Sequence, residues 1–107
     1  MEKRNKKRLL KRLFVRFGTE KPDRIGFTHD ISPTGIFIKS NFSFLPQTKL
    51  KIELTLPDEK ICHCSGVVVW AKRVPPAFNR IIHKHGMGVR FLEIHGEYQS
   101  FIERLLG

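Results

Sequence analysis

The chain has 107 residues, which is the length of one domain, because a single hydrophobic core usually takes about 100–150 residues. It is 40% hydrophobic and has no apolar run near the roughly 18 residues that a bilayer span needs, so we expect a folded, cytoplasmic domain. Lys and Arg number 20 against 10 Asp and Glu, and the net charge of +10 predicts an anionic partner. Cys62 and Cys64 are the only cysteines, too few for a secreted disulfide framework.

The positive charge is concentrated at the amino terminus. Eight of the 20 Lys and Arg lie before residue 17, where Glu2 is the only acid. Residues 1–8 are predicted to form a flexible basic arm, because like charges repel and no hydrophobic residue follows Met1 until Leu9. Apolar and polar residues then alternate over 10–18, which predicts a strand with Leu13, Val15 and Phe17 on one side.

Five further strands follow, joined by turn residues. Segments 24–32 and 35–40 flank a Pro-Thr-Gly turn and are expected to pair with each other. Segment 49–57 alternates most regularly, and 60–71 is a long β-rich run in which Gly66 is expected to mark a bulge or a bend. A surface loop is expected over 72–86, before a strand at 87–94. The chain ends on a predicted helix over 96–106, with one apolar face made of Tyr98, Phe101, Ile102 and Leu105.

These elements predict an all-β fold. We expect a small six-stranded antiparallel β-barrel, Greek-key and split-barrel-like, over residues 9–94, because closure removes the exposed strand edges. The carboxy-terminal helix is expected to lie against one end of the barrel, and residues 1–107 to form a single domain.

Two motifs occur together in this framework. An R-x-x-x-R pattern runs from Arg4 to Arg8, and a D-x-S-x-x-G pattern runs from Asp30 to Gly35 at a corner between two strands. Their order and spacing resemble the PilZ domain, a bacterial receptor module for cyclic di-GMP. The likeness continues in VVVWAKR at 67–73 and GMGVRF at 86–91, so it covers nearly the whole chain. It implies a receptor or adaptor in motility or exopolysaccharide regulation, with no cofactor, in which nucleotide moves the arm and signals to a protein effector.

The residue types suit such a ligand. The planar fork of Arg4 and Arg8 can bind a guanine edge or a phosphate and stack on a purine. Asp30 can accept the N–H donors of guanine, Ser32 can bind phosphate or base, and Gly35 allows a close approach or a positive φ. Arg8 and Arg12 form a second R-x-x-x-R frame that stays open. Lys3 and Arg12 are candidate additional contacts.

Other interpretations remain beside this one. Asp30 and Ser32 could instead bind the backbone of the turn, and Trp70 is expected in the core or at an end of the barrel, with ligand contact as the alternative. The C-x-C spacing of Cys62 and Cys64 is too short for the usual zinc sites, so we expect two buried thiols and no metal.

Two other functions also remain open. A basic barrel that binds RNA or DNA is disfavoured because most Phe fall at expected core positions, which leaves few aromatic rings for base stacking. The other open function is that of a PilZ-like module that binds only a protein. No catalytic motif is found, so an enzyme is not expected.

Overall fold

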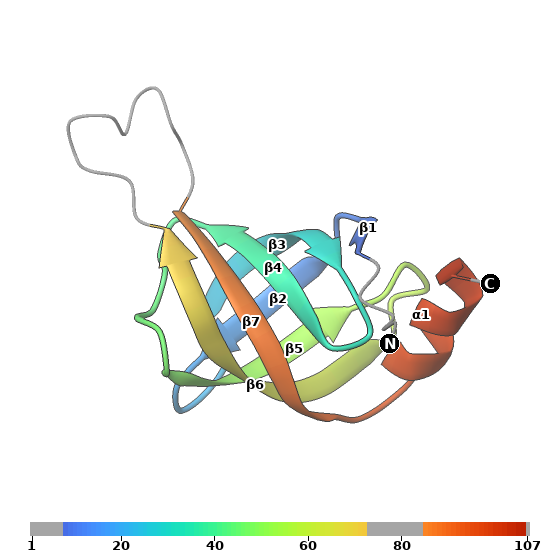
Figure 1. Cartoon of the computed structure of the whole chain (residues 1–107). Helices are drawn as coiled ribbons and strands as arrows, with labels where there is room; N and C mark the ends of the chain where they lie inside the picture. The colour runs from blue at the N-terminus through green and yellow to red at the C-terminus, as the bar shows by residue number, and fades with distance from the viewer. Residues whose placement is uncertain (1–7, 73–84, 107) are drawn as a thin grey trace.

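The computed structural model describes residues 8–72 and 85–106, which form a barrel of strands with one helix (Figure 1). The elements in chain order are β1 (Leu9–Leu10), β2 (Phe14–Gly18), β3 (Arg24–Ile31), β4 (Gly35–Ser40), β5 (Lys49–Thr55), β6 (Ile61–Lys72), β7 (His85–Ile94) and α1 (Tyr98–Leu106). The strands pair in the order β1-β3-β2-β5-β6-β7-β4, and β4 also pairs with β3. That last pairing closes a six-stranded antiparallel barrel, as predicted, with β1 as an extra strand.

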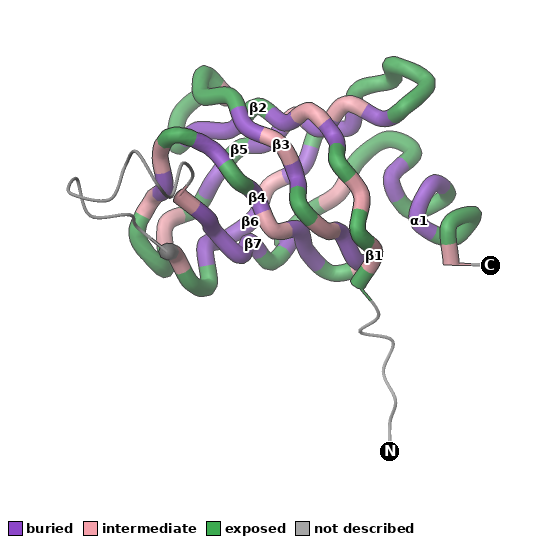
Figure 2. Tube along the Cα trace, turned by 90° about the horizontal axis from the view of Figure 1, so that it is seen from above, coloured by how far each residue is buried: buried purple, intermediate pink, exposed green. Residues whose placement is uncertain are grey.

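Alternation along the strands builds the core. In β5, Leu50, Ile52 and Leu54 are buried inside the barrel, whereas Lys49 and Lys51 are exposed outside. Figure 2 shows the same change between buried and exposed positions along the other strands. Because successive side chains of a strand point to opposite faces, period-two hydrophobicity fixes which face lines the interior.

The first predicted strand is interrupted. Leu13, Val15 and Phe17 are buried as expected, but residues 11–13 leave the ladder between β1 and β2. Buried Thr28 of β3 fills the gap: the Leu13 N–H donates to its Oγ1 at 2.8 Å, and the hydroxyl donates to the Lys11 carbonyl at 2.6 Å. The side chain of Thr28 thus replaces ladder bonds that the alternation alone would predict.

The pairing of β6 with β7 contains two irregularities. Ser65 pairs with Glu93 and Gly66 with Phe91, so the extra residue is Leu92 of β7, opposite the bulge or bend predicted at Gly66, and the register shifts there. It shifts again because Val68 pairs with Val89 while Trp70 pairs with Gly88, so Val69 is an extra residue. As a result, Val69 and Trp70 are both exposed.

Helix α1 lies at one end of the barrel (Figure 1). It begins at Tyr98 and buries Tyr98, Phe101 and Ile102 against the core, whereas Leu105 stays 40% exposed. In the described part of the chain α1 is the sole helix, and it is too short to traverse a lipid bilayer. Strand β7 starts at His85, two residues before the predicted Met87, and most of the loop expected over 72–86 lies outside the described residues.

Candidate functional site

The corner between β3 and β4 is a tight turn organised by Ser32. The Ser32 N–H donates to the Gly35 carbonyl at 2.9 Å. Its Oγ accepts from the N–H groups of Thr34 and Gly35 at 3.3 and 3.1 Å. Ser32 is 1% exposed, so the interpretation of this residue as a turn-forming serine is borne out by the geometry.

Neighbouring atoms leave no room for a side chain at Gly35. A Cβ at this position would lie 2.3 Å from the carbonyl oxygen of Val89, on the adjacent strand β7. In the described residues the one glycine with positive φ is Gly96, so Gly35 does not use the conformational freedom that the sequence allowed it. Its absent side chain lets β4 and β7 approach each other at the start of the turn.

Arg8 joins this corner from the other end of the sequence. Its Nε donates to Asp30 Oδ1 at 2.5 Å, and its guanidinium also donates to Ser32 Oγ at 3.3 Å. The side chains of Arg8 and Asp30 are 45% and 16% exposed, so the pair is open to solvent on one side. Three predicted site residues therefore lie together, with Arg8 held against the barrel by these two hydrogen bonds. Lys3 and Arg4 lie outside the described residues.

Tyr98 of α1 supports the turn from inside. Its hydroxyl donates to the Ser32 carbonyl at 2.5 Å, and its ring lies edge-on to Phe91 with centroids 5.1 Å apart. Tyr98 is fully buried, and this burial raises the pKa of the phenol well above its ordinary value, which keeps the hydroxyl as a donor. The sequence identified Tyr98 as core but gave no sign of this bond, because the two residues are 66 positions apart.

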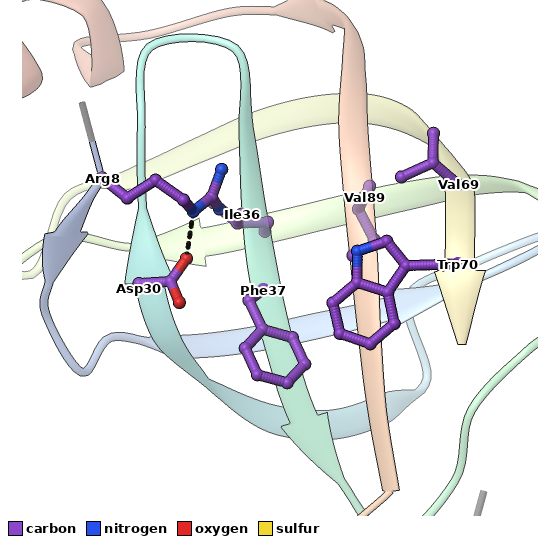
Figure 3. A pocket seen from close by; sticks show the side chains of 8 residues that line it. Arg8, Asp30, Ile36, Phe37, Val69, Trp70 and Val89 are labelled. Atoms are coloured by element: carbon purple, nitrogen blue, oxygen red, sulfur yellow. Dashed lines mark hydrogen bonds and ion pairs between the residues drawn. The ribbon is translucent and has the colours of Figure 1, made fainter. Parts of the chain in front are cut away.

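A hollow of about 270 Å³ opens beside Arg8 and Asp30 (Figure 3). We call it the nucleotide hollow, after the ligand that the sequence resemblance implies. Two aromatic side chains on its wall, Phe37 of β4 and Trp70 of β6, have ring centroids 5.0 Å apart. The remaining lining residues are Ile36, Val69, Gly88 and Val89.

Two glycines of β7 make room for these rings. A Cβ at Gly88 would lie 2.1 Å from Trp70 Nε1, and one at Gly86 would lie 2.6 Å from the Phe37 ring. The GMG segment therefore leaves space for both aromatic rings on the outer surface of the sheet. Trp70 is 47% exposed, so its expected place in the core was wrong. The bulge at Val69 turns it outward, and no sequence pattern marked that bulge.

Most phenylalanines also differ from expectation. Of the eight in the described residues, only Phe17, Phe91 and Phe101 are buried, so the prediction that most lie in the core was wrong. The others are half-buried, and three of them occupy outward positions of β2, β3 and β4, namely Phe14, Phe27 and Phe37. Aromatic rings are therefore available on the outer surface.

Arg12 lies away from the nucleotide hollow. Its guanidinium is 4.0 Å from the centroid of the Phe27 ring, in a separate hollow. Both R-x-x-x-R frames share Arg8, and Arg8 is the arginine that the structure brings to Asp30.

Cys62 and Cys64 are free, buried thiols, as expected. Burial raises the pKa of Cys64 to about 12, which keeps this thiol protonated near neutral pH. The described residues contain no cluster of three or more His, Cys, Asp or Glu that could hold a metal ion.

The fold and the site define a small antiparallel β-barrel domain with a polar corner beside an aromatic hollow. The model of the PilZ domain family matches residues 2–107, and the chain belongs to this family. PilZ domains are binding and adaptor modules and not enzymes. Comparison with curated protein sequences returns no significant match.

Among solved structures, the chain is similar to the Bacillus subtilis inhibitor of motility, MotI/DgrA. The TM-score is 0.73 at 22% sequence identity, a likeness of fold. The match covers 99% of this chain and 53% of that one, so the chain spans about half the length of this structural relative.

Proposed function

We propose that this protein is a receptor or adaptor for cyclic di-GMP that signals to a protein effector. The observation that carries the proposal is the convergence of Arg8, Asp30 and Ser32 at the rim of the nucleotide hollow. Family membership supports it, because both family motifs contribute to this corner. The name of the structural relative, an inhibitor of motility, favours motility over exopolysaccharide production as the regulated process.

The polar corner matches the donors and acceptors of the ligand. Asp30 receives Arg8 on Oδ1 and His29 on Oδ2, yet a carboxylate has further lone pairs for the N1–H and N2–H of guanine. Arg8 keeps N–H donors for a phosphate or for guanine O6 and N7. In this proposal the buried Ser32 acts by holding the turn and the Arg8 guanidinium in place.

The aromatic wall supplies a stacking surface. Trp70 and Phe37 lie on the same hollow as the Arg8–Asp30 pair and expose ring surface to it (Figure 3). A purine stacked there is worth about 1–3 kcal/mol by comparison with other aromatic–base contacts. The ligand then lies between ring faces and charged groups, and each part of a guanine nucleotide has a matching partner.

Nucleotide binding also provides a signal. Arg8 already contacts Asp30, so a guanine that uses Asp30 must share or displace this arginine. We propose that Arg8 and the residues before it, including Lys3 and Arg4, move onto the nucleotide and change the surface offered to the effector. The protein acts in the bacterial cytoplasm, a reducing compartment in keeping with two free cysteines.

Isothermal titration of the full chain with cyclic di-GMP tests the proposal. For micromolar binding the total is about −8 kcal/mol, so loss of one charge-assisted bond of roughly 1.5–3 kcal/mol weakens binding at least about tenfold. We expect this loss in Arg8→Ala and in Asp30→Ala. The matched controls Arg16→Ala and Asp58→Ala remove the same side chains outside the hollow and retain binding. Equal behaviour of site and control variants would refute the proposal.

A basic barrel that binds single-stranded nucleic acid is the second candidate. The outward phenylalanines and the net charge of +10 favour it. A labelled oligonucleotide titrated over a salt series distinguishes the two functions. Tight oligonucleotide binding with a steep salt slope, unaffected by Asp30→Ala, would replace the nucleotide proposal with this one.

A further inference from the structure

A second hollow lies on the outer face of β3 and β4 and shares no lining residue with the nucleotide hollow. It has a volume of about 200 Å³ and is lined by Arg12, Phe27, Thr28, His29 and Lys39. We call it the cationic groove. The two hollows are adjacent, because the His29 ring lies edge-on to Phe37 with centroids 5.6 Å apart.

The backbone around Arg12 is held in place on both sides. Thr28, buried in β3, accepts from the Leu13 N–H and donates to the Lys11 carbonyl through one hydroxyl. The Thr28 N–H in turn donates to the Leu13 carbonyl at 2.9 Å. Three hydrogen bonds therefore fix the residues before and after Arg12, and its position in the groove is preorganised.

The Arg12 guanidinium is also oriented. It stacks on Phe27 at 4.0 Å from the ring centroid, and Phe14 meets the same ring edge-on at 5.8 Å. Stacking covers one face of the guanidinium and leaves the N–H donors at its edge free, which is the geometry that binds a carboxylate in a bidentate way. Lys39 pairs with Phe27 in the sheet register, so a second cation lies beside the same ring.

Within the described residues these two charges lack an acidic partner. Neither Arg12 nor Lys39 forms an ion pair with another of the residues in 8–72 and 85–106. Asp30, the one acid of β3, is occupied by Arg8 and His29. Arg16, the outward cation of β2, has a 3.9 Å contact to Glu53, and its Nε donates to the Pro22 carbonyl at 3.3 Å. The groove is therefore complementary to a negatively charged group from outside the domain.

We propose that the cationic groove docks an acidic segment of a protein partner. Its carboxylates bind Arg12 and Lys39, and an apolar side chain beside them covers Ile25, which is 57% exposed and two residues before Phe27 on the same strand face. A nucleic acid suits the groove less well, because Arg12 already covers one face of Phe27 and the edge of Phe14 packs against the same ring. This surface is separate from the nucleotide hollow, so the proposal goes beyond nucleotide binding.

The test uses the full chain and a defined probe. A fluorescein-labelled peptide in which Asp-Glu pairs alternate with Leu is titrated against the protein by anisotropy, and an Asn-Gln analogue is the uncharged control. Amide NMR of the same titration locates the peptide. The variant Arg12→Gln/Lys39→Gln removes two charges from the groove, and Lys49→Gln/Lys51→Gln removes two exposed charges from β5.

The expected result is specific. The peptide shifts the amide resonances of residues 11–13, 25–29 and 39. The variant Arg12→Gln/Lys39→Gln lowers peptide affinity about tenfold or more, whereas the β5 variant Lys49→Gln/Lys51→Gln lowers it much less. The single variant Lys39→Gln retains the backbone hydrogen bonds on both sides of Arg12, and a thermal melt checks that it is folded. We expect this variant also to bind the peptide more weakly.

Four results would overturn the proposal. The first is an equal loss of peptide affinity in the two double variants, and the second is a set of amide shifts elsewhere on the barrel. The third is absence of peptide binding. The fourth is an oligonucleotide that binds the groove more tightly than the peptide and with a steep salt dependence. The last of these would assign the groove to nucleic acid.

Discussion

The hydrogen bond between helix α1 and the β3–β4 turn gives a quantitative prediction. Tyr98→Phe removes the hydroxyl that donates to the Ser32 carbonyl at 2.5 Å and keeps the ring that packs on Phe91. Tyr98 is fully buried, so loss of the donor leaves a buried carbonyl without this partner. We expect the free energy of unfolding to fall by about 1–3 kcal/mol. For a domain of this size each kcal/mol lowers Tm by about 4–8 °C.

The same substitution has a second, site-specific effect. The turn presents Ser32 and Gly35 and begins two residues after Asp30, so a looser turn spends less time in the geometry that we propose binds the ligand. We expect cyclic di-GMP affinity to fall severalfold in Tyr98→Phe. Urea denaturation measures stability, and calorimetry of the folded protein measures affinity.

A matched variant separates the two effects. Ser40→Ala removes another buried hydroxyl, which donates to the Phe42 carbonyl at the far end of β4. It is expected to lower stability to a similar extent and to retain nucleotide affinity. An unchanged stability of Tyr98→Phe would refute the reasoning on the buried bond. Equal affinity losses in both variants would refute the link between Tyr98 and the turn.

Three further predictions concern the wall of the hollow, the core and the segment before β2. Gly88→Ala places a Cβ within 2.1 Å of the Trp70 indole, so the ring must move and the fluorescence of this single tryptophan must change; an unchanged spectrum would contradict the packing. Burial raises the pKa of Cys64 from its ordinary value near 9 to about 12. The unfolded thiol therefore ionises first, so the contribution of Cys64 to stability is constant below about pH 9 and is lost as the pH rises toward 12. Urea titrations across this range should show a shallower fall for Cys64→Ala, and an equal slope would exclude this thiol as a cause. Thr28→Val keeps the side-chain shape but removes the acceptor of the Leu13 N–H, so the free energy of unfolding should fall by about 1–3 kcal/mol. Stability equal to that of the parent protein would show that the backbone before β2 is held by other contacts.

The barrel could be predicted because its determinants are local. The alternation of apolar and polar residues in segments such as Leu50 to Leu54 indicates directly which residues face inward. Turn residues such as Pro57 separate one strand from the next. The helix followed from the spacing of Tyr98, Phe101 and Ile102. These signals depend on neighbours in the sequence and need no knowledge of the pairing between strands.

The features that were missed depend on pairing between distant strands. Trp70 faces outward because its register against Gly88 shifts by one residue, and the break before β2 depends on Thr28, fifteen or more positions away. The contact of Tyr98 with Ser32 likewise joins residues that are 66 positions apart. A single sequence does not show directly how residues of distant strands pair.

The candidate site was predicted in part. The motif positions led to Arg8, Asp30 and Ser32, and the structure brings these side chains together. Their role as ligand contacts stays a prediction. Of the aromatic wall, Trp70 was named as a ligand contact only as an alternative and Phe37 was not named, although the two glycines of GMGVRF, which make room for both rings, were part of the family likeness.

The most direct test of nucleotide binding uses the one indole of the protein as a probe. Trp70 is the single tryptophan, so its indole N–H gives one resonance in a nitrogen–proton NMR spectrum. The account predicts that excess cyclic di-GMP moves this resonance together with the amides of Asp30, Ile31 and Ser32, and that Asp30→Ala prevents both changes. If the indole and the turn amides keep their positions at saturating nucleotide, the ligand does not bind in this hollow.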